Sequence, residues 1–139
     1  MEIKFFLLNG ALHNPEEPAI TLPDGTQAWF KNGRRHREVG PAIISPQAKE
    51  WWFNGRRHRL DGPAIEYSGG DTVWYNDGKI DRRDGPAVQY AQGSYYFFIK
   101  NKKYSFEDWL DKLEITDAEK AVFLYLKWKP VAEPWSRLL

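Results

Sequence analysis

A unit of about 23 residues occurs five times along this chain, and this repetition limits the possible folds more than any other feature. Each copy opens with an aromatic residue, and three residues later comes Asn or Asp, followed by Gly in four of the copies. The opening aromatic residues are Phe6, Trp29, Trp51, Trp74 and Phe98. Twelve residues after each of the first four stands a proline, which Ala and then Ile or Val follow. Such regular spacing is typical of stacked units that bury each other's hydrophobic faces.

Each copy has the pattern of a β-hairpin followed by a connector. The runs AIIS, AIEY and AVQY after the prolines favour strands, and PDGT, SGGD and AQGS supply turn residues. After the next aromatic strand, Asn-Gly or Asp-Gly supplies the positive φ angles of a tight turn. The sequence therefore predicts a mainly β fold, an elongated antiparallel meander of four to five hairpin repeats over residues 1–104. Each repeat adds two strands and should advance the array by roughly 9.5 Å.

Residues 105–139 change to helical periodicity and are predicted to form a C-terminal helical cap and tail. Trp109 and the apolar residues three or four positions from it predict a first helix. Thr116 and Glu119 match a capping box, which predicts a second helix that ends near Trp128. This second helix is apolar on almost all sides, which indicates burial or a partner.

Composition narrows the class of protein. At 139 residues the chain has the size of one domain. Its 20 basic and 19 acidic residues give a net charge of +1, so anion binding would have to come from local clusters. The absence of cysteine excludes disulfides and thiolate metal sites and fits a cytoplasmic protein. No apolar run reaches the length of a signal-sequence core or of a membrane span.

The three histidines, His13, His36 and His58, stand at one repeat position, where the fourth copy has Asp81. A ladder of metal ligands is one hypothesis, but equivalent positions should lie roughly 9.5 Å apart. Ligands of a single zinc ion need bonds of about 2.0–2.1 Å. We therefore expect no metal and no cofactor, and we expect each histidine to cap the connector in which it stands.

Eight of the nine arginines fall in segments that the pattern assigns to connectors, so a regular sheet should gather them along one edge. Asp61 and Asp84 lie in the same connectors, and arginine–carboxylate forks between successive repeats are one interpretation. The other interpretation is an anion-binding edge for nucleic acid or a nucleotide signal. Its candidate residues are Arg34, Arg35, Arg56, Arg57 and Arg83.

The aromatic residues divide into expected core and expected surface. The tryptophan that opens a repeat should be core, because truncating a buried tryptophan destabilises a fold by about 3–5 kcal/mol. Aromatic residues of the other strand parity, in turns or in the unrepeated C-terminus are the candidates for protein contacts. They are Trp52, Tyr75, Tyr95, Tyr96, Trp128 and Trp135. No nucleophile motif, phosphate-binding glycine loop or unrepeated acid–base pair occurs, so we expect no catalytic site and no enzyme.

The pattern W-x-x-N-G-R-R-H-R-x-D-G-P-A-I resembles a repeat of small proteins from tailed bacteriophages and some bacteria. That repeat is similar to the MORN repeat, which also builds hairpins into an elongated antiparallel sheet. The resemblance covers residues 4–104 and is strongest in residues 29–45 and 51–67. MORN proteins are typically scaffolds that bind partners or lipids. Here HRxDGPA replaces the MORN glycine pattern, so the resemblance implies the fold and not lipid binding.

By this resemblance we expect a non-catalytic binding protein, encoded by a phage and acting in the bacterial cytoplasm. Phage proteins of this size often inhibit or redirect a host factor, for example a defence protein, so a host protein is the expected partner. The anion-binding edge is the alternative function. Self-association through an edge strand or through helix packing is compatible with both.

Overall fold

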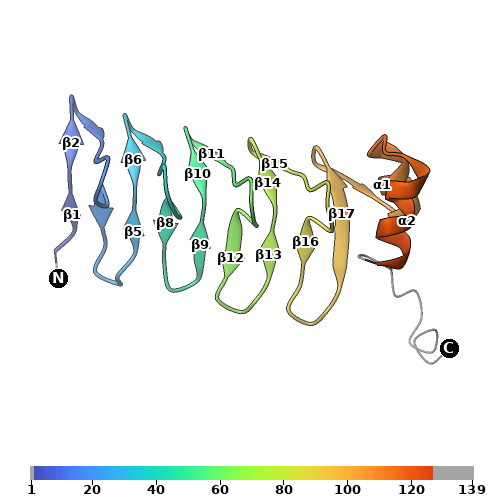
Figure 1. The fold of residues 1–139 in the computed structure, drawn as a ribbon. Helices are drawn as coiled ribbons and strands as arrows, with labels where there is room; N and C mark the ends of the chain where they lie inside the picture. Colours follow the sequence, from blue (N-terminus) through green and yellow to red (C-terminus); the bar gives the residue numbers. More distant parts are fainter. Residues whose placement is uncertain (1, 127–139) are drawn as a thin grey trace.

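The structure is a computed structural model that describes residues 2–126. The repeats form one elongated antiparallel array, a single layer deep, with two helices at its far end (Figure 1). Each repeat ascends along one path, turns at the upper edge and returns by a longer path to the next lower turn (Figure 1). The predicted mainly β meander followed by two C-terminal helices is confirmed.

The lower halves of the repeats join in one ten-stranded sheet in which neighbouring strands run antiparallel. In spatial order its strands are β1 (Lys4–Phe5), β4 (Ile20–Thr21), β5 (Gln27–Ala28), β8 (Ile43–Ile44), β9 (Ala48–Glu50), β12 (Ile65–Tyr67), β13 (Thr72–Val73), β16 (Val88–Gln89), β17 (Tyr95–Ile99) and β18 (Lys102–Tyr104).

The upper halves of the first four repeats are two-stranded hairpins closed by the predicted two-residue turns. They pair β2 (Leu7–Leu8) with β3 (Ala11–Leu12), β6 (Phe30–Lys31) with β7 (Arg34–Arg35), β10 (Trp52–Phe53) with β11 (Arg56–Arg57), and β14 (Tyr75–Asn76) with β15 (Lys79–Ile80). In the third turn Asn54 has φ 48° and Gly55 has φ 81°, the left-handed values that the Asn-Gly pattern predicts.

Backbone hydrogen bonds join each repeat to the next near the bottom and at the top of the array. In the lower half, the Ala42 N–H of one returning path donates to the Glu50 carbonyl of the next ascending path at 2.8 Å. At the top, the N–H of the turn residue Gly55 donates to the Arg35 carbonyl of the preceding repeat at 2.8 Å, and this bond recurs at all four junctions between repeats. The array is therefore one continuous hydrogen-bonded structure.

The two faces of the sheet differ in what covers them. On one, the open face, Glu50 and Arg57 form an ion pair at 3.2 Å. On the other, the connector face, Arg59 of the third connector lies over the ring of Trp51 at 3.8 Å. Because successive strand residues point to opposite sides, Trp52 belongs to the open face and Trp51 to the connector face. The connectors thus cover one face and leave the other uncovered.

The fifth repeat is shifted by one residue from the sequence alignment. The Lys100 N–H donates to Oδ1 of Asp81 at 2.9 Å, the bond that the first turn residue makes in the other repeats. Lys100 and Asn101 have φ values of 47° and 69°, so they occupy the two turn positions that Asn-Gly fills elsewhere. The position equivalent to the repeat-opening tryptophan is therefore Phe97 and not Phe98. Asn tolerates the left-handed backbone better than most residues, which allows a turn without glycine.

Two helices close this end of the array. Helix α1 (Phe106–Lys112) begins at the place where a fifth connector would begin. Its Trp109 is fully buried, packs against Phe97 and donates from Nε1 to the Arg82 carbonyl at 3.1 Å. Helix α2 (Asp117–Tyr125) follows and has the predicted capping box. Trp109 therefore links the helices to both of the last two repeats.

Only one side of α2 packs on the molecule. Phe123 lies edge-on against Trp109, whereas Tyr125 and Leu126 are exposed. The expected end of the helix near Trp128 lies outside the described residues. No helix within residues 2–126 combines the length and the apolar character that a membrane span needs.

Candidate functional site

An arginine in each of three connectors lies over the tryptophan that opens its own repeat. The distances from guanidinium carbon to ring centroid are 3.8, 3.8 and 3.9 Å for Arg37–Trp29, Arg59–Trp51 and Arg82–Trp74. Each arginine also donates to the carbonyl of the connector proline four residues later. Asp61 and Asp84 pair with the arginine of their own connector, at 3.3 and 2.7 Å, whereas an arginine–carboxylate pair between successive repeats is formed by Arg56 and Asp77 at 3.1 Å. These arginines stabilise the scaffold through stacking and charge-assisted hydrogen bonds.

The histidine position joins successive repeats, which corrects the expectation that each histidine caps its own connector. Nδ1 of His58 accepts a hydrogen bond of 2.9 Å from the N–H of Asp77, the first turn residue of the next repeat. The equivalent bonds run from Asn32 to His13, from Asn54 to His36 and from Lys100 to Asp81. The acceptor reaches the next repeat because adjacent strands are only about 4.8 Å apart, and a turn N–H needs a partner.

A groove opens between the second and third connectors. Its volume is about 830 Å³, and its lining includes Val39 from one connector and Leu60 from the next. These two side chains are 83% and 81% exposed. Trp51 and the partly exposed Phe53, from the strand segment beneath, contribute further apolar lining. Large apolar side chains held open to water around one hollow are typical of a binding site.

The next groove along the sheet, between the third and fourth connectors, is smaller and polar. Its volume is about 380 Å³. Its lining includes Asn76, Arg83 and Asp61, and Leu60 of the third connector borders it as well. In the apolar groove the same three repeat positions hold Phe53, Leu60 and Val39. Two grooves built on the same scaffold therefore differ in chemistry at these three positions, and at a fourth the apolar groove has Glu38 where its neighbour has Leu60.

Hydrogen bonds fix the base of the apolar groove. The ring of Phe53 lies on that of His36, with 4.3 Å between centroids. His36 accepts at Nδ1 from the Asn54 N–H and contacts Oε1 of Glu38 through Nε2 at 2.8 Å. This hydrogen bond from His36 lowers the pKa of Glu38 below the ordinary glutamate value. The groove is therefore formed before any partner arrives, which limits the ordering that binding requires.

The aromatic residues predicted to make protein contacts lie in different parts of the molecule. Trp52, Tyr75 and Tyr96 alternate onto the open face, where Arg35 and Arg57 flank Trp52 at 4.9 and 4.8 Å from its ring centroid. Tyr95 points to the connector side and packs against the helix-capped core at Phe97. Trp128 and Trp135 lie outside the described residues. The structure therefore brings three of the six onto one face.

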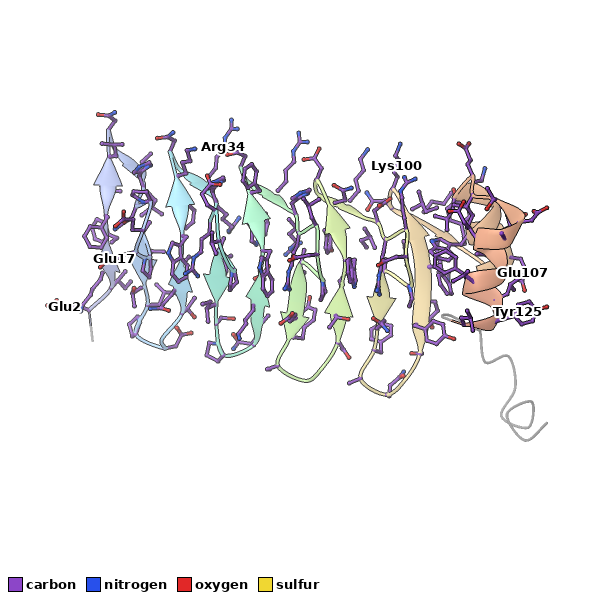
Figure 2. All side chains as sticks on the ribbon, in the orientation of Figure 1. Glu2, Glu17, Arg34, Lys100, Glu107 and Tyr125 are labelled. Atoms are coloured by element: carbon purple, nitrogen blue, oxygen red, sulfur yellow. The ribbon has the colours of Figure 1, made fainter. Side chains whose placement is uncertain are left out.

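The arginines of the proposed anion-binding edge are also divided. Arg34 and Arg35 belong to β7, and Arg56 and Arg57 to β11, which corrects their assignment to connectors. Arg35 and Arg57 stack on the open face, and the stem of Arg34 crosses the turn glycine of the next repeat near the upper edge of the array (Figure 2).

Carboxylates neutralise part of this charge. Arg56 pairs with Asp77 at 3.1 Å, and Arg83, which does lie in a connector, pairs with Asp81 at 3.5 Å. Within residues 2–126 no group of three or more His, Asp or Glu side chains could hold a metal ion. The candidate anion residues do not converge on one ligand position.

Sequence patterns alone did not single out Val39, Phe53 or Leu60. The signal for them is a difference from the other interior copies, which have a charged or polar residue at each of these positions. Repeated residues build the scaffold, whereas residues that break the repeat have to be explained in another way. Comparison with protein-family models, curated proteins and solved structures found no match to this chain.

Proposed function

We propose that the protein is a non-catalytic binding protein that seats an apolar side chain of a partner protein in the groove between its second and third connectors. The resemblance to phage repeat proteins makes a host bacterial protein, such as a defence factor, the proposed partner in the bacterial cytoplasm. In this proposal the chain belongs with MORN-like repeat scaffolds and inhibits or redirects what it binds.

The observation that carries the proposal is the contrast between the two grooves. Val39 and Leu60 are more than four-fifths exposed around a preformed hollow. The equivalent positions in the next groove are polar, although the connector backbone, the stacked arginine and the tryptophan are the same. The scaffold therefore does not require apolar residues there, and a partner does.

The chemistry of the groove defines the part of the partner that fits it. Apolar lining suits an aromatic or aliphatic side chain, which is the usual anchor of a protein interface. The charged residues around it have both signs, with Glu38 and Asp61 beside Arg37 and Arg59. A partner segment with polar residues of both charges around one large apolar residue is therefore complementary to it.

The test uses the polar groove as the template for a variant. Val39→Asp, Phe53→Asn and Leu60→Arg together give the three apolar positions the residues that the neighbouring groove has there. Tagged wild-type and variant proteins are incubated with bacterial lysate at high salt after nuclease treatment. We expect one host protein to be retained by the wild type and its retention to fall at least about tenfold in the variant, because anchor residues contribute about 2 kcal/mol or more.

A matched control separates the groove from general surface hydrophobicity. Tyr125→Ser removes another apolar side chain that is 80% exposed, on α2, and should leave retention unchanged. Equal retention by the triple variant and the wild type would overturn the assignment to the groove. Circular dichroism and thermal unfolding of each variant verify that the fold is kept.

The anion-binding alternative gives a different result in the same assay. Nucleic-acid binding at the upper edge would give retention that requires low salt and is lost after nuclease treatment. Retention would also fall in the double variant Arg34→Ser, Arg56→Ser. On duplex DNA the affinity would then decrease with salt with a slope near −0.9 per phosphate neutralised. The ion pair of Arg56 with Asp77 argues against a free cationic row.

A further inference from the structure

The strands at the start of the array, β1 and β2, pair with β4 and β3 on their inner side. On their outer side, no strand among the described residues pairs with them. Both sides of this edge are apolar. Phe5 and Leu7 on the open face and Phe6 and Leu8 on the connector face are all between 47% and 57% exposed. The edge has no proline and one charged side chain, Lys4, so it lacks most of the features by which proteins block pairing at a sheet edge.

The free backbone groups of this edge can be identified from the interior repeats. The carbonyls of Ala28 and Phe30 accept hydrogen bonds from the returning path that precedes them, and Phe5 and Leu7 hold the equivalent positions. Phe6, between them, donates to the Ala19 carbonyl inside its own repeat. Because backbone groups alternate in direction along a strand, Phe5 and Leu7 present their N–H and C=O groups outward, as does Ile3.

The other end of the array cannot supply the missing neighbour in a second molecule. Helix α1 begins directly after β18, and the two helices occupy that end of the sheet (Figure 1). Head-to-tail addition of one molecule to the next, which would give an open filament, is therefore blocked. The edge that remains is identical in every molecule, so a symmetric pair is the closed arrangement that it allows.

We propose that a second copy of this chain pairs antiparallel along β1 and β2, with Phe5 opposite Phe5 and Ile3 opposite Leu7. This register joins outward-facing residues to outward-facing residues and forms about six backbone hydrogen bonds. The two central kinds of pair, Phe5 with Phe5 and Ile3 with Leu7, are apolar on both sides. Each Lys4 lies opposite Phe6 of the other copy and each Glu2 opposite Leu8, so like charges do not meet. A second copy matches the edge because it presents the same apolar residues on both sides.

The pairing has a consequence for the grooves. Directly opposite residues of paired strands project to the same face, so the connector faces of both copies point the same way. The dimer would carry two apolar grooves on one surface. A partner with two binding segments would then be held more tightly than by either groove alone. The dimer does not depend on the proposed function, since it rests on the edge alone.

The first test blocks the edge without touching the hydrogen bonds inside the chain. Leu7→Pro removes an outward N–H and leaves the inward-facing bonds of Phe6 in place. A pair of lysine variants supplies a matched comparison of edge and distant site. Phe5→Lys lies at the edge, and Leu60→Lys changes an exposed residue of a distant connector.

The readout is the mass in solution as a function of protein concentration, by sedimentation velocity or light scattering. We expect the wild type and Leu60→Lys to reach about twice the mass of one chain, and Leu7→Pro and Phe5→Lys to remain at the mass of one chain. A wild type that stays monomeric up to about 100 µM would overturn the proposal, since a specific homodimer of micromolar affinity would form there. So would a dimer that survives both edge variants.

The second test does not depend on disruptive variants. The chain has no cysteine, so a single introduced cysteine can form a disulfide only with another molecule. In the proposed register the two Phe5→Cys residues form a hydrogen-bonded pair with about 5.5 Å between Cα atoms, within the range for a disulfide. We expect Phe5→Cys to cross-link under mild oxidation and Leu60→Cys not to do so. Equal cross-linking of both, or of neither, would overturn the register and the dimer.

Discussion

The first and fifth repeats have phenylalanine at the same repeat position, but its environment differs. Phe6 is 49% exposed, whereas Phe97 is 4% exposed. In the fifth repeat, α1 replaces the connector, and Trp109 packs on Phe97 with 4.7 Å between ring centroids. In the first repeat, Asn14 stands where three others have the stacking arginine, and no described residue covers the outer edge.

This difference shows that burial in the array is a property of neighbours and not of the repeat itself. Each interior repeat has hydrogen bonds on both sides and an arginine over its aromatic ring. The last repeat obtains the equivalent cover from a helix. Among residues 2–126 neither an arginine nor a helix covers the aromatic ring of the first repeat, so its apolar residues are exposed, as expected of a terminal unit.

The largest expected effect breaks the helical cap. Trp109→Ala removes a fully buried ring that packs on Phe97 and donates to the Arg82 carbonyl. We expect the free energy of unfolding to fall by about 3–5 kcal/mol. Phe6→Ala, at the open end, should lower it by about 1 kcal/mol or less, because half of the ring is already in water.

Urea denaturation followed by tryptophan fluorescence and circular dichroism measures both values. The protein concentration is kept low so that self-association does not add to the stability. Similar losses for Trp109→Ala and Phe6→Ala would contradict the contrast between the capped and the open end.

An intermediate effect compares the first and the last junction between repeats. Asp81 accepts from the Lys100 N–H at 2.9 Å and is buried, whereas the equivalent bond of His13 with Asn32 is exposed. Asp81→Leu should lower the free energy of unfolding by about 1–3 kcal/mol, since it leaves a turn N–H without its acceptor. His13→Leu should lower it less.

Rescue identifies the hydrogen bond as the cause. The other three junctions use histidine at this position, so Asp81→His should recover part of the loss seen in Asp81→Leu, as judged from urea midpoints. If Asp81→His is as unstable as Asp81→Leu, the acceptor is not what holds the last two repeats together.

The smallest effect lies between the two ends, in the second connector. Hydrogen bonding to His36 lowers the pKa of Glu38 in the folded state. The stability from this contact is therefore present above the ordinary glutamate pKa, about 4.3, and is lost as pH falls through the lower folded value. Glu38→Gln should be slightly less stable than wild type at pH 6, and the difference should shrink toward pH 3. A difference in urea midpoints that grows on acidification would contradict the sign.

Much of the scaffold could be predicted from the sequence because its causes are local. Asn-Gly pairs predicted the turns, and the 23-residue spacing predicted one hairpin per copy. The capping box at Thr116 and Glu119 predicted the start of α2. The register of the fifth repeat was not predictable in this way. The sequence pattern places Asn101 at the first turn position, whereas in the structure Lys100 is the first turn residue and Asn101 the second.

The contacts between repeats could not be predicted from local sequence, because they join residues about 20 positions apart that lie on neighbouring strands. Spacing predicted that the histidines are equivalent, but only the neighbouring strand shows that each one binds the turn of the next repeat. Neighbouring arginines such as Arg34 and Arg35 look alike in sequence and fall on opposite faces, because a strand alternates its side chains.

The sequence by itself determined the repeating unit, its turns, its core aromatic position and the helical end, since each follows from patterns within about 23 residues. The tertiary structure alone decided that Val39 and Leu60, 21 residues apart, line one groove and that Phe5 and Leu7 lie on an outer edge to which no strand of residues 2–126 is added. The physical reason is that stacking sets adjacent connectors roughly 9.5 Å apart, so chemistry at this scale arises between repeats and not within one.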